Sequence, residues 1–192
     1  MKTIKRIVLV ILIPVTIALL FRGWLYRHMV TYTSVGQRTN YLATDAKLVS
    51  YIETNSDSKK DTGIRGIIKL ALSITSRQLH FTASQNDNDP NRLINSKAAH
   101  CVGYAAFFST TCNYLLKKYK LDNTWIAKPQ TGQLYFLGIN IHKYFHAAFF
   151  KDHDFVIIEN RLIGEILAVD PTVNDYFYID FITCKPDENR RH

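Results

Sequence analysis

A histidine and an aspartate, 17 residues apart, flank a predicted β-hairpin that spans residues 155–169. The two strands are short, rich in β-branched and aromatic residues, and separated by a turn. An antiparallel register with a four-residue turn pairs Phe155 with Ala168 and, one pair further, His153 with Asp170. Opposed residues carry Cβ atoms about 5 Å apart on one face of a sheet. The sequence therefore predicts an imidazole–carboxylate hydrogen bond, which fixes the ring tautomer and favours the imidazolium.

A cysteine stands at the predicted start of a buried helix, directly after a polar loop. Thiolates are favoured at helix N-termini, because free N–H groups and the helix dipole stabilise negative charge. Cys101, His153 and Asp170 follow one another in the order nucleophile, base and orienting carboxylate. We predict that these three residues form a catalytic triad. The other two cysteines, Cys112 and Cys184, are expected to be structural.

The segments around the three residues resemble those of the transglutaminase-like superfamily. The family has a cysteine segment followed by aromatic and small residues, here residues 100–106 (HCVGYAA). It has a His–x–aromatic–hydrophobic segment, here residues 153–156 (HDFV), and an apolar strand that ends in Asp-Pro-Thr, here residues 168–172 (AVDPT). The resemblance covers about residues 60–175 and implies a papain-like thiol fold that acts on peptide or protein substrates.

The resemblance leads to two functional hypotheses. The first is a cysteine-dependent acyl-transfer enzyme, which hydrolyses or transamidates amides through a Cys101 thioester without a cofactor. The alternative is a catalytically silent transglutaminase-like module that binds or assembles other proteins. The sequence departs from the family pattern at Phe155, where tryptophan is frequent, and at His100, where small residues are frequent. Asn95 precedes Cys101 at the spacing of a papain-like glutamine, and we leave it out of the predicted site.

Other histidines compete for the role of base. His146 is the second choice, although the same hairpin register places it opposite Phe177 rather than a carboxylate. His142 has no matched acid, and His100 adjoins Cys101 in a helix, where neighbouring side chains point in different directions. Zinc is not expected, because the His142/His146 pair lacks the closely spaced cysteines of a structural zinc site.

Helical patterns come before strand patterns, which predicts an α+β fold. The helix that carries Cys101 is apolar on more than one side and is expected to be buried against an antiparallel sheet. The predicted helices cover residues 61–79 and 101–116. The predicted strands cover residues 125–127, 133–141, 155–159 and 165–169.

The net charge of +8 is concentrated at the N-terminus. Residues 1–40 contain six basic residues and no acid, whereas the rest has 18 basic and 16 acidic residues and a net charge of only +2. The high isoelectric point therefore does not indicate a nucleic-acid surface.

A run of 20 residues, 7–26, that is apolar apart from a few positions such as Arg22 follows the basic N-terminus and has the length of a transmembrane helix. We expect a single-pass signal anchor with the domain on the extracytoplasmic side, and a cleaved signal peptide is the competing interpretation. The expected organisation is an anchor at 1–27, a tether at 28–45, a transglutaminase-like domain at 46–184 and a polar tail at 185–192.

Overall fold

The computed structural model describes residues 2–56, 63–84, 87–145 and 151–185 of the 192-residue chain. The helices are α1 (Lys2–Leu20), α2 (Arg22–Met29), α3 (Ala46–Ser56), α4 (Ile64–Gln78), α5 (Pro90–Ser96), α6 (Cys101–Lys118), the short 3-10 helix η1 (Ile141–Tyr144) and α7 (Pro171–Phe177). The strands are β1 (Val30–Gln37), β2 (His80–Phe81), β3 (Ala98–Ala99), β4 (Trp125–Phe136), β5 (Ile139–Asn140), β6 (His153–Asn160), β7 (Ile166–Val169) and β8 (Thr183–Lys185).

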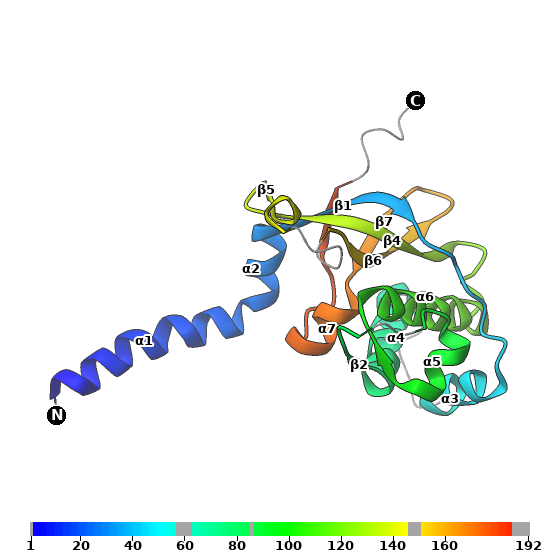
Figure 1. Ribbon diagram of the computed structural model, residues 1–192, viewed down its shortest axis with the longest axis horizontal. Helices are drawn as coiled ribbons and strands as arrows, with labels where there is room; N and C mark the ends of the chain where they lie inside the picture. Colours follow the sequence, from blue (N-terminus) through cyan, green and yellow to red (C-terminus); the bar gives the residue numbers. More distant parts are fainter. Residues whose placement is uncertain (1, 57–62, 85–86, 146–150, 186–192) are drawn as a thin grey trace.

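The main sheet has the strand order β7-β6-β4-β1-β8, and β5 extends it by pairing with β4 (Figure 1). Strand β8 runs parallel to β1, whereas the other pairs are antiparallel. The Ile182 N–H, just before β8, donates to the Ala168 carbonyl of β7 at 3.0 Å, so the two edges of the sheet almost meet. Tyr32 and Phe155 pack with Ala168 and Ile182 in one buried cluster. The sheet is therefore curved into a nearly closed, barrel-like form.

The predicted fold class is wrong, because the sheet is neither purely antiparallel nor open. We expected an α+β domain with a papain-like or transglutaminase-like core and an antiparallel sheet, and the structure is a mixed α/β arrangement with a nearly closed sheet. The difference comes from β1, which lies in the segment expected to be a tether. By pairing with β4 on one side and with β8 on the other, β1 brings a parallel strand into the sheet and curves it toward β7.

The N-terminal helices also differ from the expectation. Within the described residues, no helix has both the length and the apolar character needed to cross a bilayer. Helix α1 begins at Lys2 and ends at Leu20. Its longest uncharged stretch is residues 7–20, a length of about 21 Å against a hydrocarbon core of about 30 Å. The helical conformation is interrupted at Phe21, and α2 begins at the next residue. This finding overturns the predicted single-pass anchor, on which the expected extracytoplasmic location depended.

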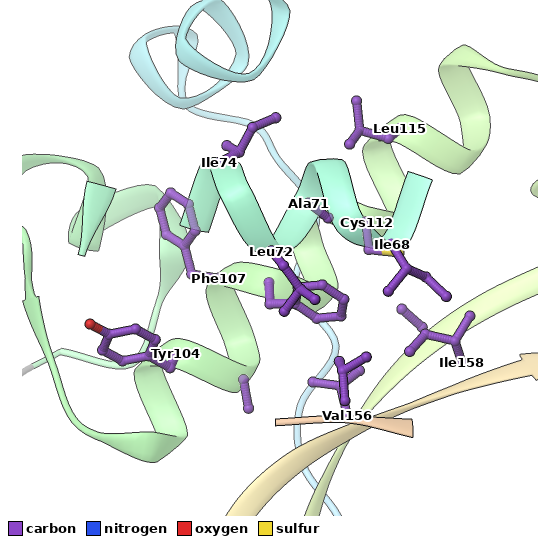
Figure 2. Close-up of a cluster of buried hydrophobic side chains, with 14 of the residues drawn as sticks. Ile68, Ala71, Leu72, Ile74, Tyr104, Phe107, Cys112, Leu115, Val156 and Ile158 are labelled. Atoms are coloured by element: carbon purple, nitrogen blue, oxygen red, sulfur yellow. The ribbon is translucent and has the colours of Figure 1, made fainter. Parts of the chain in front are cut away.

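Helices α4 and α6 cover one face of the sheet and form the main core with it (Figure 2). Ile68 and Leu72 of α4 point toward the sheet, where Val156 and Ile158 of β6 close the cluster, and Phe107 of α6 lies near Ile74 (Figure 2). Most residues of α6 are buried, because the helix lies between α4 and the sheet. The core therefore fixes the start of α6, where the candidate nucleophile lies.

Strand β4 is one continuous strand where two were predicted. The segment 128–132, which contains Pro129 and Gly132, has the composition of a turn. In the structure Pro129 pairs with Val156 inside the ladder, and its carbonyl accepts the Arg38 N–H at 2.9 Å. Neighbouring strands on both sides of β4 stabilise this extended conformation, which the local sequence does not favour.

The register of the β6–β7 hairpin is shifted by two residues from the predicted one. Ile157 pairs with Ala168 and Glu159 with Ile166, so His153 and Asp170 are not directly opposite. A shift of one residue would have turned one side chain to the other face, but a shift of two preserves the face. His153 and Asp170 therefore become diagonal neighbours, within reach of each other across the pair of strands.

Gly132 pairs with His153 and is required by the packing inside the sheet. A Cβ atom at this position would lie 2.9 Å from Cδ1 of the buried Phe155 ring and 3.0 Å from the Thr33 carbonyl oxygen. We expect Gly132→Ala to lower the free energy of unfolding by about 1–3 kcal/mol, because the overpacked core must shift. Urea unfolding measures the loss. Gly36→Ala is the matched control, since nothing lies within 4 Å of a Cβ at that position, and an equal loss in both variants would contradict this account.

Candidate active site

The structure brings His153 and Asp170 together. Nε2 of His153 lies 2.6 Å from Oδ2 of Asp170, and the carboxylate is fully buried whereas the imidazole is 23% exposed. His153 is the first residue of β6, and Asp170 follows the last residue of β7. The buried carboxylate therefore orients a ring that other molecules can still reach.

Asp170 also caps helix α7. Its Oδ1 accepts the backbone N–H groups of Thr172 at 3.0 Å and Val173 at 3.1 Å, and Pro171 occupies the first helical position. Aspartate is a preferred N-cap residue and proline is favoured directly after it. The Asp-Pro-Thr sequence thus forms a rigid strand-to-helix corner. The backbone of α7 holds Oδ1 of Asp170, and Oδ2 faces His153.

Tyr32 donates a fourth hydrogen bond to this carboxylate, which the sequence did not indicate. Its hydroxyl donates to Oδ2 of Asp170 at 2.7 Å, and the Tyr26 hydroxyl lies 2.6 Å from the Tyr32 oxygen. The single Tyr32 proton is used by Asp170, so Tyr26 is the donor to Tyr32. The two hydroxyls form a chain that leads from α2 through β1 to the carboxylate.

The pKa values of the pair move in opposite directions. Burial alone would lower the pKa of His153, but the charge and hydrogen bond of Asp170 outweigh it and hold that pKa well above its usual value. Burial alone would raise the pKa of Asp170, but the His153 charge and the hydrogen bonds from His153 and Tyr32 lower it. The imidazolium–carboxylate form is therefore the favoured state of the pair.

Cys101 interacts with the same imidazole. Its side chain lines the same cavity as His153 and lies close enough to add, through its charge and hydrogen bonding, to the rise of the pKa of His153. Because Nε2 is engaged by Asp170, Nδ1 is the ring nitrogen left for the sulfur. The structure thus brings together all three predicted residues, from α6, β6 and the β7–α7 corner.

The start of α6 is arranged by His100. Its Nδ1 accepts the backbone N–H of Val102 at 3.3 Å, which makes His100 the N-cap of the helix. Burial lowers the pKa of His100, which keeps the ring in the neutral form that a cap acceptor requires. His100 is therefore a positioning residue for Cys101. The Cys101 N–H, one of the first N–H groups of the helix, has no acceptor within α6.

Cys101 and His153 open into one cavity of about 320 Å³. Its described lining residues come from both layers of the fold. They are Phe81, Cys101, Leu134, Ile141, His142, Phe145, Asp152, His153 and Thr172. Cys101 is 9% exposed. The thiol is thus neither on the open surface nor sealed in the apolar interior, and a small carbonyl compound can approach it from the cavity.

No protein-family model, curated protein or solved structure matches this chain.

The other two cysteines lie in different surroundings. Cys112 is fully buried in the main core, and burial raises the pKa of its thiol to about 12. Burial also raises the pKa of the Cys184 thiol to about 11. All three cysteines are free thiols, so the protein carries one thiol beside an imidazole and two that stay protonated at neutral pH.

A partly buried ion pair lies next to the site and was not predicted. Nε of Arg38 donates to Oδ2 of Asp154 at 2.9 Å, and Nη2 donates to Oδ1 at 3.0 Å. Asp154 follows His153 directly, and its carboxylate is fully buried. Burial raises the pKa of Asp154, and the Arg38 guanidinium opposes that rise. This bidentate ion pair joins the end of β1 to the start of β6 and so helps to fix the strand that carries the candidate base.

The remaining candidates fall outside the triad. His146 lies outside the described residues, and His142 lines the cavity. Oδ1 of Asn95 accepts from Nζ of Lys47 at 2.7 Å, which engages it at an exposed position. In the described part of the chain, no group of three or more His, Cys, Asp or Glu side chains is placed to hold a metal ion.

We expect the pH dependence of stability to report on His153. The folded pKa is raised, so this residue stabilises the protein fully below its unfolded pKa of about 6.5, and the contribution is lost as pH rises through the folded value. His153→Gln should therefore remove part of the fall in unfolding free energy above pH 6.5, measured by urea unfolding between pH 5 and 9. His80→Gln, at an exposed position, is the control. Parallel curves for wild type and His153→Gln would contradict the prediction.

The hydroxyl chain gives a second prediction. Tyr32→Phe removes a hydrogen bond to a buried carboxylate, and we expect a loss of about 1.5–3 kcal/mol in unfolding free energy at pH 7. Tyr26→Phe removes only the outer, neutral bond, with an expected loss of about 0.5–1.5 kcal/mol. Urea unfolding of both variants compares the two steps. A larger loss for Tyr26→Phe would show that the carboxylate bond is not the dominant one.

Proposed function

We propose that the protein is a cysteine-dependent acyl-transfer enzyme with Cys101 as nucleophile, His153 as general base and acid, and Asp170 as the orienting carboxylate. One observation carries the proposal. The imidazole that hydrogen-bonds to a buried carboxylate at 2.6 Å shares one cavity wall with a thiol that is close enough to raise the pKa of that imidazole. Nucleophile, base and orienting group in mutual contact are the requirement for nucleophilic catalysis by a thiol.

The first step forms a thioester. The reacting state is a thiolate–imidazolium pair, in which the Cys101 proton is held on Nδ1 of His153 and Asp170 stabilises the imidazolium. The thiolate sulfur then bonds to an amide or ester carbonyl carbon, and the carbonyl oxygen takes the negative charge. As the carbon–nitrogen or carbon–oxygen bond breaks, the imidazolium returns the proton to the departing amine or alcohol.

The negative oxygen needs a donor close to the sulfur. The backbone N–H of Cys101 stands at the first position of α6, where a helix supplies N–H groups without intrahelical acceptors. The helix dipole adds positive potential at the same end. This N–H is the proposed oxyanion donor, and the His100 cap keeps the adjacent peptide in place.

The second step resolves the thioester. His153 accepts a proton from water or from an amine, whose oxygen or nitrogen bonds to the acyl carbon while the sulfur leaves and regains a proton. Water gives hydrolysis and an amine gives transamidation. The motif resemblance to the transglutaminase-like superfamily extends the proposal to peptide or protein amides as the substrate class.

Thiol reactivity gives the direct test. We expect iodoacetamide to modify one thiol per folded chain, Cys101, because burial keeps Cys112 and Cys184 protonated. Peptide mapping by mass spectrometry identifies the site, and denaturation should expose all three thiols. Cys101→Ala should abolish amide cleavage, and His153→Ala should lower kcat/KM by about 10²–10⁴-fold.

Labelled casein with and without a fluorescent primary amine separates the two outcomes of the second step. Incorporation of the amine indicates transamidation, and new carboxyl groups indicate hydrolysis. Cys184→Ser and His80→Ala are the controls for a cysteine and a histidine outside the site. If Cys101 reacts at the rate of free cysteine and His153→Ala leaves that rate unchanged, the proposal is wrong and a catalytically silent binding module takes its place.

A further inference from the structure

The wall of the cavity beside Cys101 is mainly apolar. Phe81, Leu134, Ile141 and Phe145 line it, and they come from β2, β4, η1 and the residue after η1. These four segments meet only in the folded chain, since Phe81 belongs to the small β2–β3 sheet and Leu134 to the main sheet. Apolar side chains from separate elements thus converge next to a nucleophile.

The size of the cavity fits a small organic group. Its volume of about 320 Å³ lies at the lower end of ligand pockets and would hold roughly ten waters at about 30 Å³ each. Aliphatic and aromatic walls offer few hydrogen bonds to such waters. Replacing them with an apolar group is therefore favourable.

The charged groups on the wall decide against an anionic occupant. The Asp152 carboxylate lines the cavity, is 43% exposed and lies 3.9 Å from the Arg38 guanidinium. Among the described lining residues there is no lysine or arginine to pair with a carboxylate of the ligand, and the His153 imidazolium is already paired with Asp170. Acyl groups that end in a carboxylate are therefore disfavoured relative to uncharged ones.

We infer that this cavity binds an apolar aliphatic or aromatic group carried by the acyl donor, and so selects for hydrophobic acyl groups at Cys101. The inference rests on the proposed function, because the sulfur on the cavity wall is taken as the acyl acceptor. A hydrophobic residue of a peptide and a short fatty acyl chain share this chemistry, and the test below separates them.

The cavity is tested without turnover by a series of N-alkyl iodoacetamides with methyl, propyl, pentyl and benzyl groups. In each reaction the sulfur–carbon bond forms, the carbon–iodine bond breaks and iodide leaves, while the thiol proton passes through His153 to solvent. We expect the rate constant, divided by that for free cysteine, to rise up to about fourfold for each added methylene until the cavity is filled. A ratio that does not change with chain length overturns the inference.

Matched variants locate the effect. Ile141→Asp places a charge on the cavity wall, and Ile139→Asp places the same charge two residues away at a side chain that is 56% exposed. The chain-length dependence should disappear in Ile141→Asp and persist in Ile139→Asp. Phe145→Asp, at a side chain 47% exposed, is a second wall variant in case Ile141→Asp does not fold. Equal dependence in wall and control variants overturns the inference.

Turnover then identifies the source of the acyl group. Aminoacyl amides with glycine, leucine or phenylalanine represent peptides, and nitrophenyl esters from acetyl to hexanoyl represent fatty acyl chains. A rise of kcat/KM with apolar size in either series supports the inference, and equal values for the smallest and largest members of both oppose it. Absence of all turnover with a preserved alkylation series would reject the proposed enzyme and leave the apolar site.

Discussion

The buried carboxylate of Asp170 holds together parts of the chain that are far apart in sequence. It accepts two backbone N–H groups of α7 on one oxygen, and the Tyr32 hydroxyl and the His153 ring on the other. A buried carboxylate is costly unless its lone pairs are satisfied, and here each oxygen has two donors. One side chain therefore fixes the start of a helix, the position of β1 and the orientation of the candidate base.

The two layers of the fold contribute different parts of the site. The helical layer buries α6 against α4 and the sheet, which fixes the N-terminus of α6 and the sulfur of Cys101. The curved sheet supplies His153 and Asp170, and the Arg38–Asp154 ion pair ties β1 to the same end of β6. The thiol and the imidazole meet because the two layers pack at a fixed separation. A loss of packing in the main core would therefore reach the site by separating these groups.

The sequence predicted the pairing of His153 with Asp170 despite an incorrect register, because alternation along the strands survives a shift of two residues. The start of α6 at Cys101 was also predicted, from a polar loop followed by an apolar run. Strand β1 was missed because its polar alternation is stabilised by β4, a partner about 100 residues later. The role of Tyr32 depends on a contact across 138 positions, which no local pattern indicates.

Helix α2 is linked by hydrogen bonds to both ends of α7. Nε of Arg22 donates to the carbonyl of Phe177, the last residue of α7, at 2.7 Å. At the other end of α7, Tyr26 is linked to the N-cap residue Asp170 through the Tyr32 hydroxyl. A displacement of α2 relative to the sheet would thus strain the hydrogen bonds at both ends of α7. Removal of the N-terminal residues that include α2 would consequently alter the surroundings of the Cys101 sulfur. The reactivity of the Cys101 thiol would therefore report on the position of α2.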